Sequence, residues 1–311
     1  MTVRDLAELV RAPAGLTVPG DTLAGAASAG WPAGRRTALL PLASVSLYWA
    51  GMALNDWADR DLDALERPER PIPSGRVTPG TALALASGLT ATGVGLAARA
   101  GGAPAAAVAG VLAGAVWTYD LSAKSGPAST AVMASTRGLD VLLGAAAGGL
   151  PALRQAIAPA ALLAVHTAGV TALSRGEVHG TKPATARGAL CATTVVTTLI
   201  PVLASARALA LAHSLAEGRA GRGRGSRDGW VATGVAIAAA TAYASSVGRA
   251  QVAAVTDPGA ATTRRATVAG IKGMVPLQSA LVASAGEAGA ALALGALSWV
   301  ARSAMRKGSP T

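Results

Sequence analysis

Charged residues are scarce in this sequence, and their scarcity decides its broad class. Only 14% of the 311 residues are charged, whereas 51% are hydrophobic and the mean hydropathy is +0.44. A soluble domain of this length would have about a quarter of its residues charged. Apolar runs long enough to cross a bilayer as helices, roughly 20 residues each, recur along the chain. The composition therefore excludes a soluble globular protein and indicates an integral membrane protein.

Cysteine and phenylalanine are also rare. The one cysteine, Cys191, lies in an apolar run, so an intramolecular disulfide and a cysteine-based zinc site are both excluded. Phenylalanine is absent while alanine and glycine are abundant, a bias that is typical of a GC-rich genome. The net charge of +11 sits mostly in short segments between the apolar runs. That placement favours anionic lipid headgroups or a phosphorylated substrate as partners, and not nucleic acid.

The apolar runs predict an all-α polytopic membrane protein, with nine or ten transmembrane helices in a single domain over residues 1–311. Asp21 and two prolines interrupt the first predicted helix, and the last two helices could form one broken helix, so the count stays open. Gly110 and Gly114 in "GVLAG", and Gly144 and Gly148 in "GAAAG", have the spacing of closely packed helices. The predicted helices cover residues 13–31, 37–56, 79–100, 103–121, 129–150, 155–174, 186–212, 229–250, 264–283 and 285–302.

Two connections are longer and more polar than most, residues 57–78 and 175–187. Four predicted helices separate them, so both loops are expected on the same side of the membrane. The connection "GRAGRGRGSRDG" places arginine on the other side, yet the side with the two loops and the N-terminus carries more arginine and lysine in total. This balance favours a cytoplasmic location for the loops. We therefore expect an integral protein of a bacterial cytoplasmic membrane, with its active-site loops facing the cytoplasm.

The first polar loop begins with an acidic stretch, "NDWADRDLD", directly after an apolar run. Asp56, Asp59 and Asp63 are spaced i, i+3 and i+7, so they share one face of a helix. Asn55 borders that face, whereas Asp61 points away. Three carboxylates on one face repel each other unless a cation lies between them, and Mg²⁺ binds through one or two carboxylates together with substrate phosphates. The alternative is a solvated, charge-balanced loop, which does not require this spacing.

Basic residues follow the acids closely. A guanidinium group matches the geometry of phosphate oxygens, so arginine suits a phosphate ligand. Acids that hold Mg²⁺ and arginines that bind phosphate together predict a Mg²⁺–diphosphate site at a membrane surface. The stretch "RPIPSGR" adds two prolines and a Ser-Gly turn, which stiffen the loop. The basic residues are Arg60, Arg67, Arg70 and Arg76.

The stretch "NDWADRDLD" resembles the first aspartate motif, N-D-x-x-D-x-x-x-D, of the UbiA superfamily of intramembrane prenyltransferases. "ERPERPIPSGRV" is similar to that family's usual continuation, and the basic N-terminal segment with Arg11 and Pro13 extends the resemblance. It implies a helical bundle with a central cavity, an isoprenoid diphosphate as donor, Mg²⁺ as cofactor and the lipid bilayer as surroundings. The implied metal residues are Asn55, Asp56, Asp59 and Asp63, and the implied substrate-binding residues of this region are Arg11, Asn55, Arg67 and Arg70.

Two further segments extend the resemblance. "TYDLSAK" is similar to the family's Tyr…Lys segment, which implies Tyr119 near the reacting carbon, as a catalytic residue, and Lys124 on the diphosphate. "STRGLDVLLG" resembles a family segment of the fifth helix, with Arg137 as a substrate-binding and Asp140 as a catalytic candidate. An arginine inside a span is costly and indicates a functional site. The alternative is a buried pair in which Arg137 and Asp140, spaced i, i+3, neutralise each other.

The second loop departs from the family pattern. The family commonly carries another motif there, D-x-x-x-D, but "ALSRGEVHGTKPATAR" contains no aspartate and Glu177 is its only acid. Either Glu177 holds a second Mg²⁺ weakly, which makes it a metal and catalytic candidate, or Arg175 and Lys182 bind the diphosphate in place of that metal. His179 is a substrate-binding candidate that could instead be a metal ligand, a base or a bystander. The string "LSRGEVHG" also resembles a divergent branch of the superfamily associated with Ebo-type gene clusters.

The implied activity is Mg²⁺-dependent transfer of a prenyl or polyprenyl group from an isoprenoid diphosphate to an acceptor. Cations would stabilise the leaving diphosphate, and aromatic faces would stabilise an allylic cation. Family acceptors range from aromatic acids to lipid glycerol phosphates and a phosphoribose, and an aromatic or a phosphorylated sugar or cyclitol stays open here. Two alternatives belong to other classes: a carrier of an isoprenoid lipid, and a membrane phosphatase or phosphotransferase. The aromatic candidates are Tyr48, Trp49, Trp117 and Tyr119.

Overall fold

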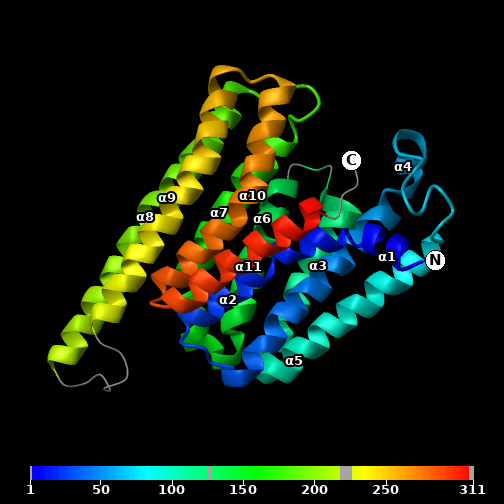
Figure 1. Ribbon diagram of the computed structural model, residues 1–311. Helices are drawn as coiled ribbons and strands as arrows, with labels where there is room; N and C mark the ends of the chain where they lie inside the picture. Colours follow the sequence, from blue (N-terminus) through cyan, green and yellow to red (C-terminus); the bar gives the residue numbers. More distant parts are fainter. Residues whose placement is uncertain (1, 125, 127, 218–225, 308–311) are drawn as a thin grey trace.

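The structure is a computed structural model that describes residues 2–124, 126, 128–217 and 226–307. This part of the chain is helical and contains no strand, as the apolar runs predict. Figure 1 shows the helices gathered into one bundle, with long helices on one flank and the N-terminal half on the other. In chain order the elements are α1 (Val3–Leu9), η1 (Ala12–Thr17), α2 (Pro19–Ser28), η2 (Gly34–Ala38), α3 (Leu39–Ala58), α4 (Arg60–Glu66), α5 (Pro79–Thr118), η3 (Tyr119–Ala123), α6 (Ser129–Ala145), η4 (Ala146–Gly148), α7 (Gly149–Ser174), α8 (Pro183–Ala216), α9 (Ser226–Thr256), α10 (Ala260–Ser284) and α11 (Ala288–Lys307).

Six helical stretches of the described chain are long and apolar enough to cross a membrane. The predicted count of nine or ten spans is not confirmed by this set. The first predicted span differs most, because residues 13–31 form the short η1 and the ten-residue α2, and ten helical residues rise only about 15 Å. The six stretches are Gly34–Ala58, Pro79–Ala123, Ser129–Ser174, Pro183–Ala216, Arg227–Thr256 and Ala260–Ser284.

Two of the six stretches are folded back on themselves. In α5, Gly101 and Gly102 have non-helical dihedral angles, and the φ of 68° at Gly102 suits glycine. The Trp117 indole donates to the Thr90 hydroxyl at 3.1 Å across 27 residues, which would lie about 40 Å apart along a straight helix. The arms of α5 therefore run antiparallel, as the separate predictions for 79–100 and 103–121 require. Gly149, with a φ of 64°, divides α6 from α7 in the same way.

Small residues let α2 and α6 approach until their backbones touch. A Cβ atom on Gly25 would lie 1.7 Å from the carbonyl oxygen of Val141, and one on Gly144 would lie 1.9 Å from that of Thr22. The packing role predicted for Gly144 is thus confirmed. The same prediction is wrong for Gly110 and Gly114. Apart from the adjacent backbone of their own helix, no atom of the described residues lies within 4 Å of the position that a Cβ would take at either glycine.

The polar connections meet at one end of the bundle. Arg175 in the second polar loop donates to the carbonyl of Gly126 at 2.8 Å, and the amide of Thr181 donates to the carbonyl of Pro258 at 2.9 Å. Lys124, just before Gly126, forms an ion pair with Asp59 of the first polar loop. These contacts connect both polar loops through the segment after η3. The prediction that the two loops share one side is therefore confirmed. Segment 218–225, which holds Arg219, Arg222 and Arg224 of the opposing connection, lies outside the described residues.

The N-terminal helix α1 is fastened to the first polar loop by Arg76. This guanidinium contacts Asp5 at 2.9 Å and Glu8 at 2.8 Å. Hydrogen bonds from Thr2, followed by that from Arg76, lower the pKa of Asp5 to about 2, and the hydrogen bond from Arg76 lowers the pKa of Glu8. Both carboxylates are therefore ionised at neutral pH. The ion pairs with Arg76 that hold α1 beside the first polar loop are formed at that pH.

Candidate functional site

A cavity of about 580 Å³ opens among α3, α4, η3 and α6, at the end of the bundle that carries the polar loops. Apolar side chains such as Leu47, Met52 and Val116 form part of its wall, and charged or amide side chains form the rest. A concave pocket of this size, with a few converging polar groups, is the usual form of a small-molecule site. The charged and amide lining residues are Arg11, Asn55, Asp59, Asp63, Glu66, Arg67, Arg70, Asp120, Lys124 and Arg137.

The acidic motif spans the break between α3 and α4. Asp59 lies at the break, and its carbonyl still accepts a helical hydrogen bond from the amide of Asp63 at 2.8 Å. Helical spacing is therefore kept across the break. Asp56 and Asp63 contact the same guanidinium, that of Arg70, at 3.5 Å and 2.5 Å. The predicted common face of these two acids is confirmed, and Asp61 lies outside it with a side chain that is 88% exposed.

Each acid on the common face has a cation beside it. Arg11 donates to Asp56 at 3.0 Å, Lys124 forms an ion pair with Asp59, and Arg70 forms one with Asp63 at 2.5 Å. The carboxylates of Asp56 and Asp63 are almost fully buried, at 6% and 2% exposure. Burying ionised carboxylates is costly unless they are paired and hydrogen-bonded, so these cations explain how the acids stay close together.

The backbone of Arg11 adopts a left-handed conformation, with φ 49° and ψ 52°. Residues other than glycine rarely adopt it, and such strained positions concentrate at functional sites. Here the turn between α1 and η1 directs the guanidinium onto the carboxylate of Asp56 and the amide of Asn55. The resemblance implied a substrate-binding role for Arg11, and the structure places this residue on the cavity wall.

Asp120 lines the cavity as well, although it is not among the site residues predicted from the sequence. It lies in η3, a π-helical turn in which the amide of Lys124 donates to the carbonyl of Tyr119 at 2.9 Å. Such turns occur frequently at functional sites. The Nδ2 of Asn55 donates to Oδ1 of Asp120 at 3.0 Å. The acid was visible within "TYDLSAK", but nothing in the sequence indicates a contact across 65 residues.

Arg137 lies at the inner end of the cavity and is paired with a different acid from the predicted one. Its Nη1 contacts Asp21 of α2 at 2.6 Å, and Asp21 also accepts a hydrogen bond from Gln278 at 2.5 Å. Asp140 instead accepts a hydrogen bond from Ser44 at 2.5 Å. The alternative in which Arg137 and Asp140 only neutralise each other is therefore wrong, because the ion pair of Arg137 connects α6 to α2.

Two of the four aromatic candidates reach the cavity. Tyr48 of α3 and Tyr119 of η3 line it. Trp117 donates to Thr90 and is not among its lining residues, while Trp49 lines a separate apolar pocket with α1. Tyr48 and Tyr119 are therefore the aromatic side chains available to a ligand in this cavity.

The second polar loop does not line the cavity. Arg175, His179 and Lys182 are exposed, and Glu177 is half-buried. Arg175 reaches the segment that follows Lys124 through its hydrogen bond to Gly126, and the carbonyl of Glu177 accepts a hydrogen bond from Arg264 at 3.2 Å. The structure thus brings together the predicted residues of the first motif, η3 and α6, and leaves those of the second loop at the periphery.

The oxygen ligands on the cavity wall suit Mg²⁺. Asn55, Asp59 and Asp63 line the cavity, and amide and carboxylate oxygens are the hard ligands that this ion prefers. Within the described residues, no three His, Cys, Asp or Glu side chains are already gathered as a metal cluster. Mg²⁺ usually takes one or two carboxylates and completes its shell with waters and substrate phosphates, so the residues present fit the ion together with a phosphorylated ligand.

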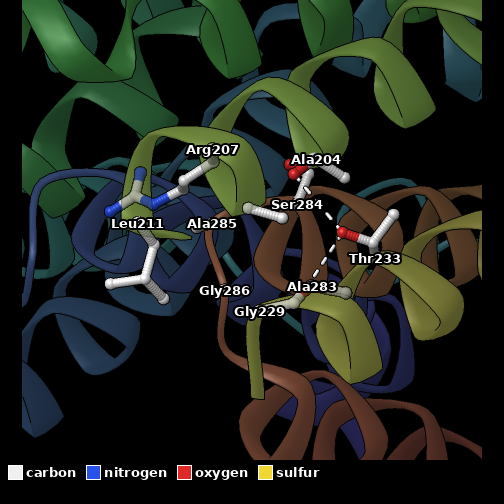
Figure 2. A pocket seen from close by; sticks show the side chains of 10 residues that line it. Ala204, Arg207, Leu211, Gly229, Thr233, Ala283, Ser284, Ala285 and Gly286 are labelled. Carbon is white, nitrogen blue, oxygen red and sulfur yellow. Dashed lines mark hydrogen bonds between the residues drawn. The ribbon is translucent and has the colours of Figure 1, made fainter. Parts of the chain in front are cut away.

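A second cavity, of about 160 Å³, lies between α8, α9 and α10 (Figure 2). Thr233 there donates to the carbonyls of Ala204 and Gly229, and Arg207 is the charged residue of its wall. The wall is otherwise built mainly from alanine and glycine, and no acid is among the described residues that line it. Phosphate and metal chemistry requires the groups of the larger cavity, which is therefore the candidate functional site.

Comparison with known proteins identifies the chain's family. The UbiA prenyltransferase family matches residues 16–215, which include most of the cavity. Relatives named digeranylgeranylglyceryl phosphate synthase include one from Halobacterium salinarum, 38% identical over 157 residues, and one from Methanopyrus kandleri, 48% identical over 59 residues. These matches cover 48% and 19% of this chain, and 55% and 22% of the relatives' own length. The chain thus spans from about a fifth to about half of the length of these relatives.

Solved structures agree with the fold. A UbiA homolog from Aeropyrum pernix K1 aligns with a TM-score of 0.57 at 20% identity, over 83% of this chain and 94% of that one. A structure from work on digeranylgeranylglyceryl phosphate synthase in membranes aligns with a TM-score of 0.60 at 16% identity, over 91% and 98% of the two chains. The motif, the fold and the family match lead to one conclusion: this chain belongs to the UbiA prenyltransferase family.

Proposed function

We propose that this protein transfers a prenyl group from an isoprenoid diphosphate to an acceptor within the membrane. The observation that carries the proposal is the cavity in which Asn55, Asp59 and Asp63 share a wall with arginine and lysine side chains, beside apolar helices. A diphosphate needs the polar end of such a site, and an isoprenoid chain needs the apolar surroundings. Membership of the family supports this reaction class.

The residues of the acidic motif would hold Mg²⁺, namely Asn55, Asp56, Asp59 and Asp63. When bound, this ion would neutralise negative charge on the diphosphate. Asp59 and Asp63 line the cavity directly, while Asp56 lies beside them under Arg11 and Arg70. The motif therefore offers oxygen ligands from two successive helices on one wall.

The basic side chains on the same wall would bind the diphosphate. Arg67, Arg70 and Lys124 line the cavity and contact the acids of the motif. These cations are already in position before the reaction begins, and they stabilise the charge that develops on the leaving diphosphate. Arg175 would act from the second loop, through its contact with the segment after Lys124.

The prenyl carbon would react between the diphosphate end and the inner end of the cavity. Tyr48 and Tyr119 present aromatic rings there, and such faces stabilise an adjacent cation. We assign the acceptor to the inner end, where Arg137 would bind its polar group and the carboxylate of Asp140 would receive its proton. A smaller space of about 60 Å³ shares Tyr48 and Arg137 with the cavity wall and is also lined by Asp140.

We propose a phosphorylated glycerol lipid as the first acceptor to test. The relatives' name, digeranylgeranylglyceryl phosphate synthase, refers to such a product, and the basic wall of the cavity suits a phosphorylated acceptor. The active-site end would face the cytoplasm of a bacterial cell, because the segments on that side carry the larger share of arginine and lysine.

Product analysis tests this assignment. Purified protein in lipid nanodiscs would be incubated with Mg²⁺ and geranyl, farnesyl, geranylgeranyl or longer diphosphates, with a prenylglyceryl phosphate, an aromatic acid or membrane extract as acceptor. We expect a product whose mass equals that of the acceptor plus the prenyl group less one hydrogen, which leaves as a proton, and we expect it to form fastest with the glyceryl phosphate. Prenylation of the aromatic acid alone would refute the proposed acceptor. Donor binding without any product in all mixtures would support the carrier alternative, and release of phosphate without prenylation would support the phosphatase alternative.

A further inference from the structure

The side-chain amide of Asn55 is held from two sides by groups of opposite character. Its Nδ2 donates to Oδ1 of Asp120 at 3.0 Å, and its Oδ1 accepts a hydrogen bond from Nη2 of Arg11 at 3.4 Å. A guanidinium can only donate hydrogen bonds, and a carboxylate oxygen accepts them. The reversed amide would place donor against donor and acceptor against acceptor. The two neighbours therefore define one orientation for this side chain.

That orientation turns the oxygen of Asn55 toward the acidic motif. The same Nη2 of Arg11 that contacts Asn55 also donates to Oδ1 of Asp56 at 3.0 Å. An amide oxygen and a carboxylate oxygen from successive residues thus converge on one cationic nitrogen. Amide and carboxylate oxygens are also the kind of ligand that Mg²⁺ takes.

Asp120 differs from the acids of the motif in its contacts. Asp56, Asp59 and Asp63 each form an ion pair with an arginine or lysine. Among the described residues, Asp120 forms no ion pair within 4 Å, and its hydrogen-bond partner is the neutral amide of Asn55. From η3 its carboxylate accepts from the amide nitrogen of Asn55, which leaves the amide oxygen available as a ligand.

We propose that Asp120 is a positioning residue, which fixes the amide of Asn55 so that its oxygen faces the metal-binding motif. The inference rests on the proposed function, because it concerns the affinity of that motif for a divalent cation. Groups that orient metal ligands through hydrogen bonds typically contribute 10- to 100-fold to metal affinity. The hydrogen bond with Asn55 also assigns a role to Asp120, which neither the acidic motif nor the spacing of "TYDLSAK" indicates.

The test is a Mn²⁺ titration followed by electron paramagnetic resonance, with full-length protein in nanodiscs and inorganic pyrophosphate present. In Asp120→Asn the amide at 120 can either donate or accept, so the orientation of Asn55 is held by its 3.4 Å contact with Arg11 alone, and we expect binding weaker by about tenfold or more. The swap Asn55→Asp with Asp120→Asn restores a donor facing an acceptor and keeps the total charge. We expect this double variant to bind Mn²⁺ within about threefold of wild type.

Asp61→Asn is the matched control, since it removes one carboxylate of the same segment from the exposed side. It should leave the titration unchanged, and a size-exclusion profile identical to wild type verifies that each variant is folded. Unchanged binding in Asp120→Asn would overturn the proposal. Failure of the swap to restore binding, together with tighter binding in Asn55→Asp alone, would also overturn it and make Asp120 a direct metal ligand. Absence of Mn²⁺ binding in wild type would overturn the metal-dependent function itself, and the positioning role with it.

Discussion

Arg70 contacts two buried acids of the motif, Asp56 and Asp63, and this single residue therefore connects the first polar loop to the end of α3. Removal of one partner from a buried ion pair destabilises a protein by about 3 kcal/mol, because the remaining charge stays buried without compensation. We expect Arg70→Gln to lower the thermal midpoint in nanodiscs and to open residues 67–78 to proteolysis.

Arg60→Gln is the comparison for Arg70→Gln, because Arg60 pairs with the exposed Asp61 at 3.6 Å. Exposed ion pairs contribute only about 0–1 kcal/mol, so this variant should melt close to wild type. Equal midpoints for the two variants would show that the buried pair contributes no more than the exposed one.

Glu177 is the acid that the second loop offers in place of an aspartate motif. Its side chain does not line the cavity, so we expect Glu177→Gln to retain at least about half of the wild-type prenyl transfer rate and an unchanged Mg²⁺ requirement. A titration of activity against Mg²⁺ concentration measures both. A loss larger than about tenfold that higher Mg²⁺ restores would assign Glu177 to the metal site instead.

Residues of the candidate site that are related by local spacing could be predicted from the sequence, whereas residues whose partners are distant in the chain could not. The acids of "NDWADRDLD" could be assigned to one face from helical geometry alone, because their relation lies within nine residues. Asp21 and Asp120 were not recognised, since their partners are 116 and 65 residues away. Only the fold brings Asp21 to Arg137 and Asp120 to Asn55, and a pairing of this kind leaves no periodic signal in the sequence.

At the scale of elements, the contact between α2 and α6 has no room for a side chain. A Cβ on Gly144 would lie 1.9 Å from a backbone oxygen of α2, and forced overpacking typically costs about 1–3 kcal/mol. We therefore expect Gly144→Ala to lower the thermal midpoint in nanodiscs. Gly114→Ala is the matched control, because the space around Gly114 is open within 4 Å. If Gly114→Ala lowered the midpoint as much as Gly144→Ala, the close packing of α2 on α6 would be refuted.

Helix boundaries were predicted well because hydropathy and glycine are local signals. The break at Gly101 and Gly102 falls between the predicted helices 79–100 and 103–121. The first span was predicted wrongly, because residues 13–31 are apolar enough for a helix but fold as η1 and the short α2. Composition does not distinguish a span from an apolar segment that packs inside the bundle, and all the residues of α2 from Gly20 to Ser28 other than Leu23 are buried.

At the scale of the whole molecule, the two ends of the chain are connected. The indole of Trp31 after α2 donates to Glu287 before α11 at 2.9 Å, across 256 residues. Gln278 of α10 also donates to the carbonyl of Thr17 at 2.7 Å. The C-terminal helices, which lie beyond the matched residues 16–215, thus help to hold the N-terminal segments that border the cavity. The membrane class and the acidic motif could be predicted from the sequence, whereas these contacts between the two ends of the chain required the fold.

If the acidic motif binds the diphosphate through Mg²⁺, loss of one of its carboxylates must slow the release of diphosphate from a labelled donor. Wild type, Asp59→Asn and Asp61→Asn would be compared in nanodiscs with Mg²⁺, the acceptor and each prenyl diphosphate. Removal of a group that stabilises developing charge typically costs 10²- to 10³-fold in rate, so we expect Asp59→Asn to be at least about a hundredfold slower, and Asp61→Asn to match wild type. Equal rates for the two variants, or no release by wild type with any donor, would contradict the account.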